Sequence, residues 1–176
     1  PHRRDGTARA DWGRPAMTDT PSPPEAPDVV LLLSGPNLNL LGERQPEVYG
    51  TATLADHVAT ATAEAARHGL VVEHLQSNHE GELVEAIHGA RGRVAAIVVN
   101  AGALTHYGWS LHDALAAFEG PVLEVHLSNP GGREPWRHTS VIAPVASGTI
   151  AGLGGDGYRL ALDAVARLLG ADGVLG

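Results

Sequence analysis

An apolar run leads into a long loop in the stretch Val29-Val-Leu-Leu-Leu-Ser-Gly-Pro-Asn-Leu-Asn-Leu-Leu-Gly-Glu-Arg-Gln-Pro-Glu-Val-Tyr-Gly50. The run Val29–Leu33 predicts a buried strand. The segment Ser34–Gly50 holds three glycines and two prolines, which exclude a long helix and predict a loop. A long loop after the first strand of an α/β domain is a common position for a functional site. Arg44 and Tyr49 lie five residues apart in this loop, and we interpret the pair as a tyrosine whose proton can be removed.

The composition fits one globular domain and narrows the possible functions. With 176 residues, of which 43% are hydrophobic, the chain can bury a core. It has no apolar run of about 20 residues, so no membrane span is expected. The net charge of −8 argues against general nucleic-acid binding. Cysteine and lysine are both absent, which excludes thiol catalysis, cysteine metal sites and Schiff-base chemistry on a lysine side chain.

Strand and helix patterns alternate along the chain. The expected strands are Val29–Leu33, Val71–Leu75, Val94–Val99, Val122–Leu127 and a short strand around Gly148–Leu153. Three helices are expected to start at the capping-box patterns Thr53–Asp56, Ser77–Glu80 and Ser110–Asp113, and a last helix covers Tyr158–Leu169. This alternation predicts an α/β fold with a doubly wound parallel sheet. Five strands suggest the flavodoxin-like strand order 2-1-3-4-5.

One domain, residues 29–170, is expected to hold all of these elements. Residues 1–28 are rich in Pro, Arg, Asp and Thr and have no hydrophobic period, which favours a disordered extension. Residues 171–176 are expected to form a flexible tail.

Polar residues follow each of the first four expected strands. In chain order these are Asn37 and Arg44, then Asn78 and His79, then Asn100 and His106, and finally His126, Ser128, Arg133 and Arg137. In a doubly wound sheet, ligands bind beyond the carboxyl ends of the strands. We therefore expect these residues to contribute to one site.

Each candidate also has an ordinary structural interpretation. Tyr49 could anchor its loop by packing, Arg44 could be a solvated charge, and His126 could be a core histidine. The corresponding interpretations for the others are a turn cap for Asn100, a helix cap for Asp113 and an ion pair with Glu134 for Arg137.

The remaining histidines do not indicate a metal. His106, His126 and His138 lack ligand spacing on one element, so no metal is expected. The histidines within predicted helices are assigned to solvated faces, and they are His57, His68, His88 and His112.

Five segments are informative together. They are Gly-Pro-Asn-Leu-Asn with Gly-x-Arg-x-Pro-x-x-Tyr-Gly (Gly35–Gly50), Gln-Ser-Asn-His-Glu-Gly-Glu-Leu (Gln76–Leu83), Asn-Ala-Gly-Ala-x-Thr-His (Asn100–His106), Glu-Val-His-Leu-Ser-Asn (Glu124–Asn129) and Arg-Glu-Pro-Trp-Arg-His (Arg133–His138). Each is weak alone. Together, and in this order, they resemble type II 3-dehydroquinate dehydratase over roughly Val29 to Leu169.

The resemblance implies a lyase that converts 3-dehydroquinate to 3-dehydroshikimate and water by anti elimination through an enolate. This is a step of the shikimate pathway toward chorismate and the aromatic amino acids. By the same resemblance Tyr49 is the general base and Arg44 stabilises its phenolate. His126 is the general acid, Glu124 helps to orient it, and Asn37 holds a water against the enolate oxygen.

The resemblance also assigns residues that bind the substrate, and it implies no cofactor. Ser128, with the backbone amides of Leu127 and Ser128, takes the substrate carboxylate. Ring hydroxyls are bound by Asn100, His106 and Arg137. Arg133 supports Arg44 or Tyr49, and Asp113 completes the site of a neighbouring subunit.

The same resemblance implies a cytoplasmic homo-oligomer, a dodecamer of four trimers. Its partner is the small-molecule substrate, and the Gly42–Gly50 loop is a lid over it.

Two other interpretations stay open. The segment Gly152–Gly157 fits G-x-G-x-x-G and suggests a non-catalytic flavodoxin-like module that binds a nucleotide or flavin. The context disfavours it, because no strand and no acidic residue about 20 positions on follow the motif. In the other interpretation the chain catalyses the same dehydration, but its biological role is the breakdown of quinate and not aromatic biosynthesis.

Overall fold

The computed structural model of the protein describes residues 27–43 and 46–170. The predictions for residues 1–26, Arg44 and residues 171–176 lie outside the described residues. The sheet has five parallel strands in the predicted order β2-β1-β3-β4-β5. The strands are β1 (Val29–Ser34), β2 (Val71–Gln76), β3 (Ala96–Asn100), β4 (Val122–His126) and β5 (Gly148–Ala151).

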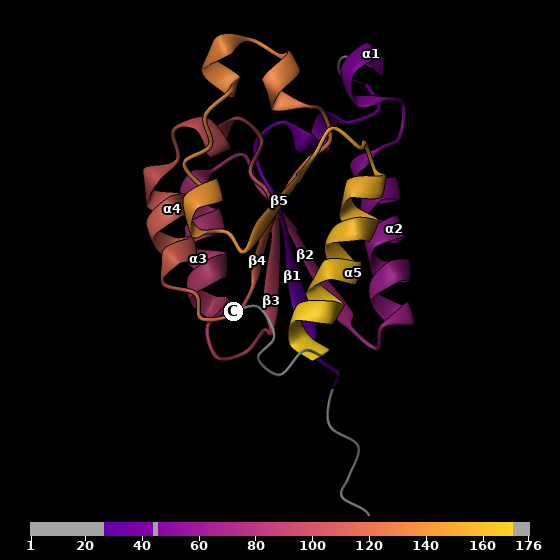
Figure 1. The fold of residues 1–176 in the computed structure, drawn as a ribbon, viewed down its shortest axis with the longest axis vertical. Coiled ribbons are helices and arrows are strands. Elements are labelled where there is room, and N and C mark those ends of the chain that lie inside the picture. The colour runs from indigo at the N-terminus through magenta and orange to yellow at the C-terminus, as the bar shows by residue number, and fades with distance from the viewer. Residues whose placement is uncertain (1–26, 44–45, 171–176) are drawn as a thin grey trace, which may run out of the picture.

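Helices cover both faces of the sheet. α2 (Leu54–Arg67) and α5 (Asp156–Gly170) lie on one face, and α3 (Glu80–Ala90) and α4 (Trp109–Ala116) lie on the other (Figure 1). The short helix α1 (Pro46–Tyr49) and the segment near residue 135 lie at one end of the molecule, at the top of Figure 1. The connections contain the 3₁₀ helices η1 (Leu38–Leu40), η2 (Gly102–His106), η3 (Pro130–Gly132), η4 (Pro135–Arg137) and η5 (Ala143–Val145).

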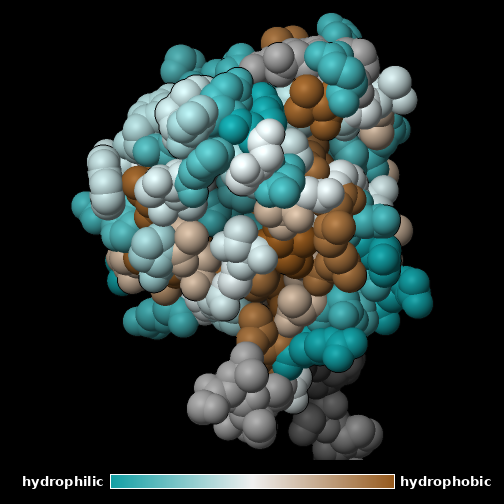
Figure 2. Space-filling model, turned by 45° about the horizontal axis from the view of Figure 1, so that its top comes forward, coloured by the Kyte–Doolittle hydropathy of each residue, from teal (hydrophilic) through white to brown (hydrophobic). Residues whose placement is uncertain are grey.

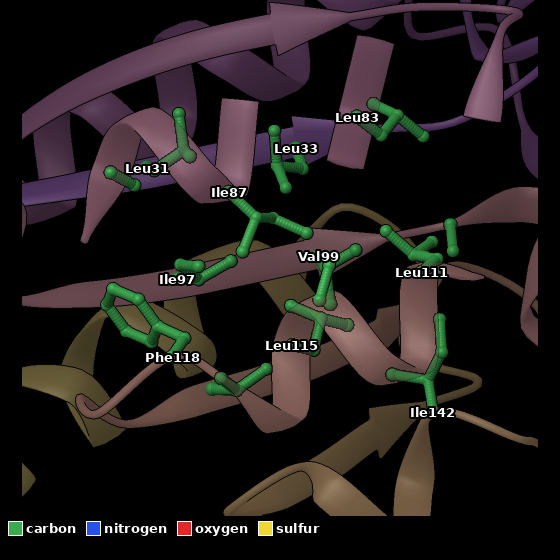
Figure 3. Packing of buried hydrophobic residues seen from close by; sticks show 14 of the residues in the cluster. Leu31, Leu33, Leu83, Ile87, Ile97, Val99, Leu111, Leu115, Phe118 and Ile142 are labelled. Atoms are coloured by element: carbon green, nitrogen blue, oxygen red, sulfur yellow. The ribbon is translucent and has the colours of Figure 1, made fainter. Parts of the chain in front are cut away.

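A hydrophobic cluster fills each face of the sheet. On one face, Leu83 and Ile87 of α3 pack with Leu111 of α4 against β1 and β3, and Figure 3 shows these side chains pointing toward one another. On the other face, inward residues of α2 and α5 pack on the same strands. β1 and β3 are buried by both clusters, which explains why their sequences read as continuous apolar runs. The sheet is thereby a rigid base for the loops at its carboxyl end.

Gly35 brings the loop after β1 against the loop after β3. Its N–H donates to the carbonyl of Asn100 at 2.8 Å. A Cβ at this position would lie 2.3 Å from the carbonyl oxygen of Ala101, so only glycine permits this approach. The first residue of the motif therefore sets how closely two site-forming loops meet.

Two of the three predicted capping boxes are wrong. The Thr53–Asp56 box is present, with reciprocal bonds between side chains and backbone. α3 begins instead after His79, and the Ser77 hydroxyl donates to Glu82. α4 begins after Gly108 with no side-chain cap.

His57 does not lie on a solvated face, so this prediction is also wrong. Its side chain is buried between α2 and α5, where it contacts Gly155 and the ring of Tyr158, with ring centroids 5.7 Å apart. Burial lowers the pKa of His57. Among the described residues no helix has both the length and the apolar character required for a membrane span.

Substitution of Thr53 by alanine should destabilise the protein by about 1 kcal/mol, because the first turn of α2 loses its capping hydroxyl. The matched control is Thr62→Ala on the exposed middle of the same helix, where the hydroxyl bonds only the Val58 carbonyl. That change should be neutral or slightly stabilising, because alanine is the better helix former. Urea unfolding of the two variants measures the difference, and equal midpoints would contradict the capping role.

Candidate active site

Two adjoining cavities lie beyond the carboxyl ends of β1, β3 and β4. The first, of about 40 Å³, is lined by Tyr49, Asn100, Gly102, His106, His126, Leu127, Ser128, Pro130 and Arg137. The second, of about 60 Å³, is lined by Pro36, Asn37, Leu38, Leu41, Tyr49, Gly102, Ala103 and Arg137. Tyr49, Gly102 and Arg137 line both, so we treat the two cavities as one strand-end pocket. Figure 2 brings this end of the molecule forward and shows hydrophilic residues over most of it.

A buried carboxylate–imidazole pair forms the wall of the pocket at β4. His126 Nε2 lies 3.0 Å from Glu124 Oε1, and the Glu124 side chain is fully buried. The Glu124 carboxylate also accepts hydrogen bonds from the hydroxyls of Thr105, Ser140 and Thr149. Burial alone would raise the pKa of Glu124, but the bonds from His126, Thr105 and Ser140 outweigh it and hold the pKa below its ordinary value. Glu124 is therefore a carboxylate that fixes His126 through Nε2 and leaves Nδ1 for another partner.

Tyr49 has a guanidinium as its partner. Arg133 Nη1 donates to the Tyr49 hydroxyl at 2.9 Å, and the guanidinium carbon lies 5.5 Å from the centre of the tyrosine ring. The bond to Tyr49 is the main reason why the pKa of Arg133 is raised. The same Nη1 contacts the Ser128 hydroxyl at 3.3 Å. Arg133 thus joins the loop of Tyr49 to the loop after β4.

The loop residues after β1 and β3 are held by specific hydrogen bonds. Asn37 has a left-handed backbone, with φ of 65°, and its N–H donates to Asn78 Oδ1 at 2.9 Å. Asn100 Nδ2 donates to the hydroxyl of Tyr158 at 3.0 Å. His106 Nδ1 is 2.7 Å from the carbonyl of Thr139, which leaves Nε2 as its other polar atom. The first contact holds the backbone of Asn37, and the other two orient the side chains of Asn100 and His106 at the pocket.

The loop after β4 supplies hydrogen-bond donors to the pocket. No described residue accepts a backbone hydrogen bond from the N–H of Leu127 or Ser128. Arg137 Nε donates to Glu134 at 2.8 Å, and its guanidinium stacks on Trp136 at 4.0 Å. The expected pairing with Glu134 is therefore present, and Arg137 lines both cavities as well.

Two of the predicted residues do not join this group. His79 and Asp113 are exposed and line neither cavity. Arg44 is outside the described residues, so the guanidinium found on Tyr49 is that of Arg133.

Several polar residues around the site were missed from the sequence. They are the donors to Glu124 (Thr105, Ser140, Thr149) and the partner of Asn100 (Tyr158), and they come from segments that are distant in the chain. Glu124 itself indicates that such donors exist, because a carboxylate inside an apolar strand requires hydrogen-bond donors around it. The sequence does not say which hydroxyls supply them.

The glycine-rich turn Gly152–Gly157 does not form a phosphate cradle. The N–H of Gly152 donates to the carbonyls of His126 and Ser128, and that of Gly154 donates to Leu127. A Cβ on Gly155 would lie 2.7 Å from the His57 ring, so the turn packs on α2. Because these amides are used within the fold, they cannot also hold a phosphate. Nothing in this turn favours the nucleotide-binding interpretation.

Within the described part of the chain, no group of three or more His, Cys, Asp or Glu side chains is arranged to hold a metal ion. The site consists of hydrogen-bonding and ionisable side chains. A tyrosine on a guanidinium and a histidine on a carboxylate line one pocket, which defines an α/β enzyme equipped for proton transfer.

The chain belongs to the class II dehydroquinase family. The family model described as Dehydroquinase class II matches residues 28–166. The chain is 57% identical over 142 residues to the 3-dehydroquinate dehydratase of Corynebacterium glutamicum, covering 81% of this chain and 98% of the relative. It is 54% identical to 3-dehydroquinate dehydratase 2 of Pseudomonas putida, over 80% of this chain and 95% of the relative.

A solved structure agrees with these sequence relatives. The type II dehydroquinase of Propionibacterium acnes superposes with a TM-score of 0.76 at 42% identity. The match covers 80% of this chain and 97% of that structure. This agreement, together with the strand order, establishes the flavodoxin-like fold.

Replacement of Glu124 by glutamine should make the free energy of unfolding depend less on pH in the acid range. The folded-state pKa of Glu124 is below its ordinary value of 4.5. Its stabilising contribution is therefore fully present above that value and is lost as the pH falls through the folded pKa. The difference in unfolding free energy between the wild type and Glu124→Gln should shrink from pH 5 to roughly pH 2.

The control is Glu119→Gln, the same substitution at an exposed position. It should keep the wild-type pH dependence. A constant difference between wild type and Glu124→Gln over the acid range would refute the ionised state of Glu124.

Proposed function

We propose that the chain catalyses the dehydration of 3-dehydroquinate to 3-dehydroshikimate. The family and the names of the relatives support this reaction. The observation that carries the mechanism is that Tyr49 and His126 line one pocket. Arg133 is the charged partner of Tyr49, and Glu124 is the charged partner of His126. The reaction requires a base for the proton alpha to the ketone, an acid for the leaving hydroxyl, and stabilisation of the enolate between them.

Tyr49 is the base in this proposal. A free tyrosine has a pKa of about 10, so a phenolate needs a nearby positive charge at neutral pH. The hydrogen bond from Arg133 to the Tyr49 hydroxyl provides such a charge. The phenolate removes the proton alpha to the ketone, and the electron pair of the C–H bond forms the enolate. Arg44 keeps its proposed role as a second cation on Tyr49.

His126 is the acid. Its Nε2 faces Glu124, so a protonated imidazole carries its other proton on Nδ1. The negative charge of Glu124 stabilises that imidazolium. When the enolate collapses, the C–O bond of the leaving hydroxyl breaks and His126 donates its Nδ1 proton to form water. In each turnover Tyr49 gains one proton and His126 loses one. Proton exchange with solvent then returns both side chains to their starting states.

The remaining side chains bind the substrate. Asn37 holds a water against the enolate oxygen. The free N–H groups of Leu127 and Ser128, with the Ser128 hydroxyl, take the carboxylate. The ring hydroxyls are bound by Asn100, His106 and Arg137, all of which line the pocket. These assignments place donors around an anionic, hydroxylated ring.

The assembly and the setting of the enzyme are part of the proposal. The exposed position of Asp113 supports a role at the site of a neighbouring subunit, in a dodecamer of four trimers. The family resemblance supports a cytoplasmic enzyme whose catalytic unit is residues 29–170. The reaction is the same in aromatic biosynthesis and in quinate breakdown, and the genes surrounding the coding sequence discriminate between these two roles.

Tyr49→Phe should lower kcat by at least about 100-fold, because it removes the base and keeps the ring. The assay mixes 3-dehydroquinate with purified protein without added metal or cofactor and follows the conjugated product in the near ultraviolet. Tyr107→Phe is the matched control, since Tyr107 is exposed and lines neither cavity. Wild-type activity that survives Tyr49→Phe would remove Tyr49 from the mechanism, and an inactive, folded wild type would refute the reaction.

Arg133→Gln should lower kcat by about tenfold or more, because the phenolate loses its hydrogen-bonded cation. The pH profile of kcat/KM should also differ from that of the wild type, because Arg133 is the charged partner of the Tyr49 hydroxyl. The comparison variant is Arg91→Gln, at an exposed arginine remote from the pocket. If the profile of Arg133→Gln coincides with that of the wild type, Arg133 does not activate the base.

A further inference from the structure

Tyr158 is a buried tyrosine that the mechanism above does not use. It lies in the first turn of α5, has no exposed surface, and packs with the cluster on that face of the sheet. Burial raises its pKa to about 12, so the hydroxyl keeps its proton at neutral pH. A phenylalanine would fill the same volume without a polar atom to satisfy. The hydroxyl therefore needs an explanation other than packing.

The hydroxyl of Tyr158 is bonded to a residue of the pocket. Asn100 Nδ2 donates to it at 3.0 Å, and Asn100 Oδ1 accepts from the N–H of Gly102 at 3.3 Å. Asn100 is 3% exposed and lines the pocket. One proton of the Asn100 amide is thus taken by Tyr158, the carbonyl is taken by the backbone, and the second amide proton is the group left for a ligand.

The chemistry of the amide fixes the direction of this bond. An amide Nδ2 group can only donate, so the Tyr158 oxygen is the acceptor. A second hydroxyl, that of Ser34, has no exposed surface, lies opposite Asn100 in the pairing of β1 with β3, and is 3.0 Å from His74 Nε2.

We propose that Tyr158 is a positioning residue that holds the Asn100 amide with a donor N–H toward the substrate. The inference rests on the proposed function, in which Asn100 binds a ring hydroxyl. Without the phenol oxygen, the buried Nδ2 group loses its acceptor, and the amide is then oriented by the 3.3 Å bond from the Gly102 N–H alone. Asn100 would be less firmly held with its N–H toward the substrate and would bind the hydroxyl less well.

The test is a double-mutant cycle on Tyr158→Phe and Asn100→Ala with 3-dehydroquinate as substrate. Tyr158→Phe should raise KM about tenfold and leave kcat within about twofold, because the lost contact binds the substrate and the transition state alike. In the Asn100→Ala background, Tyr158→Phe should change KM by less than about twofold. Equal effects of Tyr158→Phe in both backgrounds would overturn the proposal.

Val165→Ala is the control for a purely structural effect. Val165 is a fully buried residue of the same helix without a polar side-chain atom. It should lower the thermal midpoint while leaving KM unchanged. A KM increase in Val165→Ala like that in Tyr158→Phe would show that loosening α5, and not loss of the hydroxyl, is responsible.

A direct measurement on the network separates this inference from the proposed function. The side-chain amide signals of Asn100 in ¹⁵N-labelled protein without substrate should shift in Tyr158→Phe, and the amide protons should exchange faster with solvent. Unchanged signals would overturn the inference even if the wild type turns over 3-dehydroquinate. An inactive wild type with the expected shift would contradict the proposed function and leave the network established.

Discussion

The buried carboxylate of Glu124 is the interaction on which the site depends. It sits inside an apolar strand with no exposed surface, where an unpaired charge would cost several kcal/mol. Its partners come from β4, η2, the loop after η4 and β5, through His126, Thr105, Ser140 and Thr149. The requirement to satisfy one charge therefore fixes the positions of four segments at the carboxyl end of the sheet.

The pocket has a rigid side and a side built by loops. The rigid side is made by the ends of β3 and β4, where Asn100 and His126 are held by buried partners. The other side is made by the loop after β1, whose Tyr49 is held by Arg133 from the loop after β4. Both sides of the pocket meet at the same strand ends. Tyr49 on the loop side can therefore remove a proton from a bound substrate, and His126 on the rigid side can donate one to it.

Much of the fold follows from local patterns, and much of the site follows from the family motifs. All five strands lie near their predicted positions. Apolar runs located β1 and β3, because both strands are buried on both faces and need no alternation. The capping pattern was correct at Thr53, where the bonds are local. It failed at Ser77 and Ser110, where the fold sets the helix start and Ser77 bonds Glu82 instead.

The contacts that the sequence did not predict are long-range. His57 follows the pattern of an exposed helical residue, but α5 covers it, and periodicity cannot identify the covering helix. The hydrogen bond that Asn100 donates to Tyr158 joins residues 58 positions apart. Such pairs are decided by how α5 docks on the sheet and not by any local preference.

The most direct test of the role of Glu124 in catalysis is the kcat of Glu124→Gln, measured with 3-dehydroquinate on protein whose fold is verified by thermal unfolding. Glutamine keeps the shape of the side chain but removes the charge that orients His126 and stabilises its protonated form. We expect a loss of kcat of about 100-fold or more with KM within about threefold. A kcat within about threefold of the wild type would contradict it, because His126 would then act without its buried carboxylate.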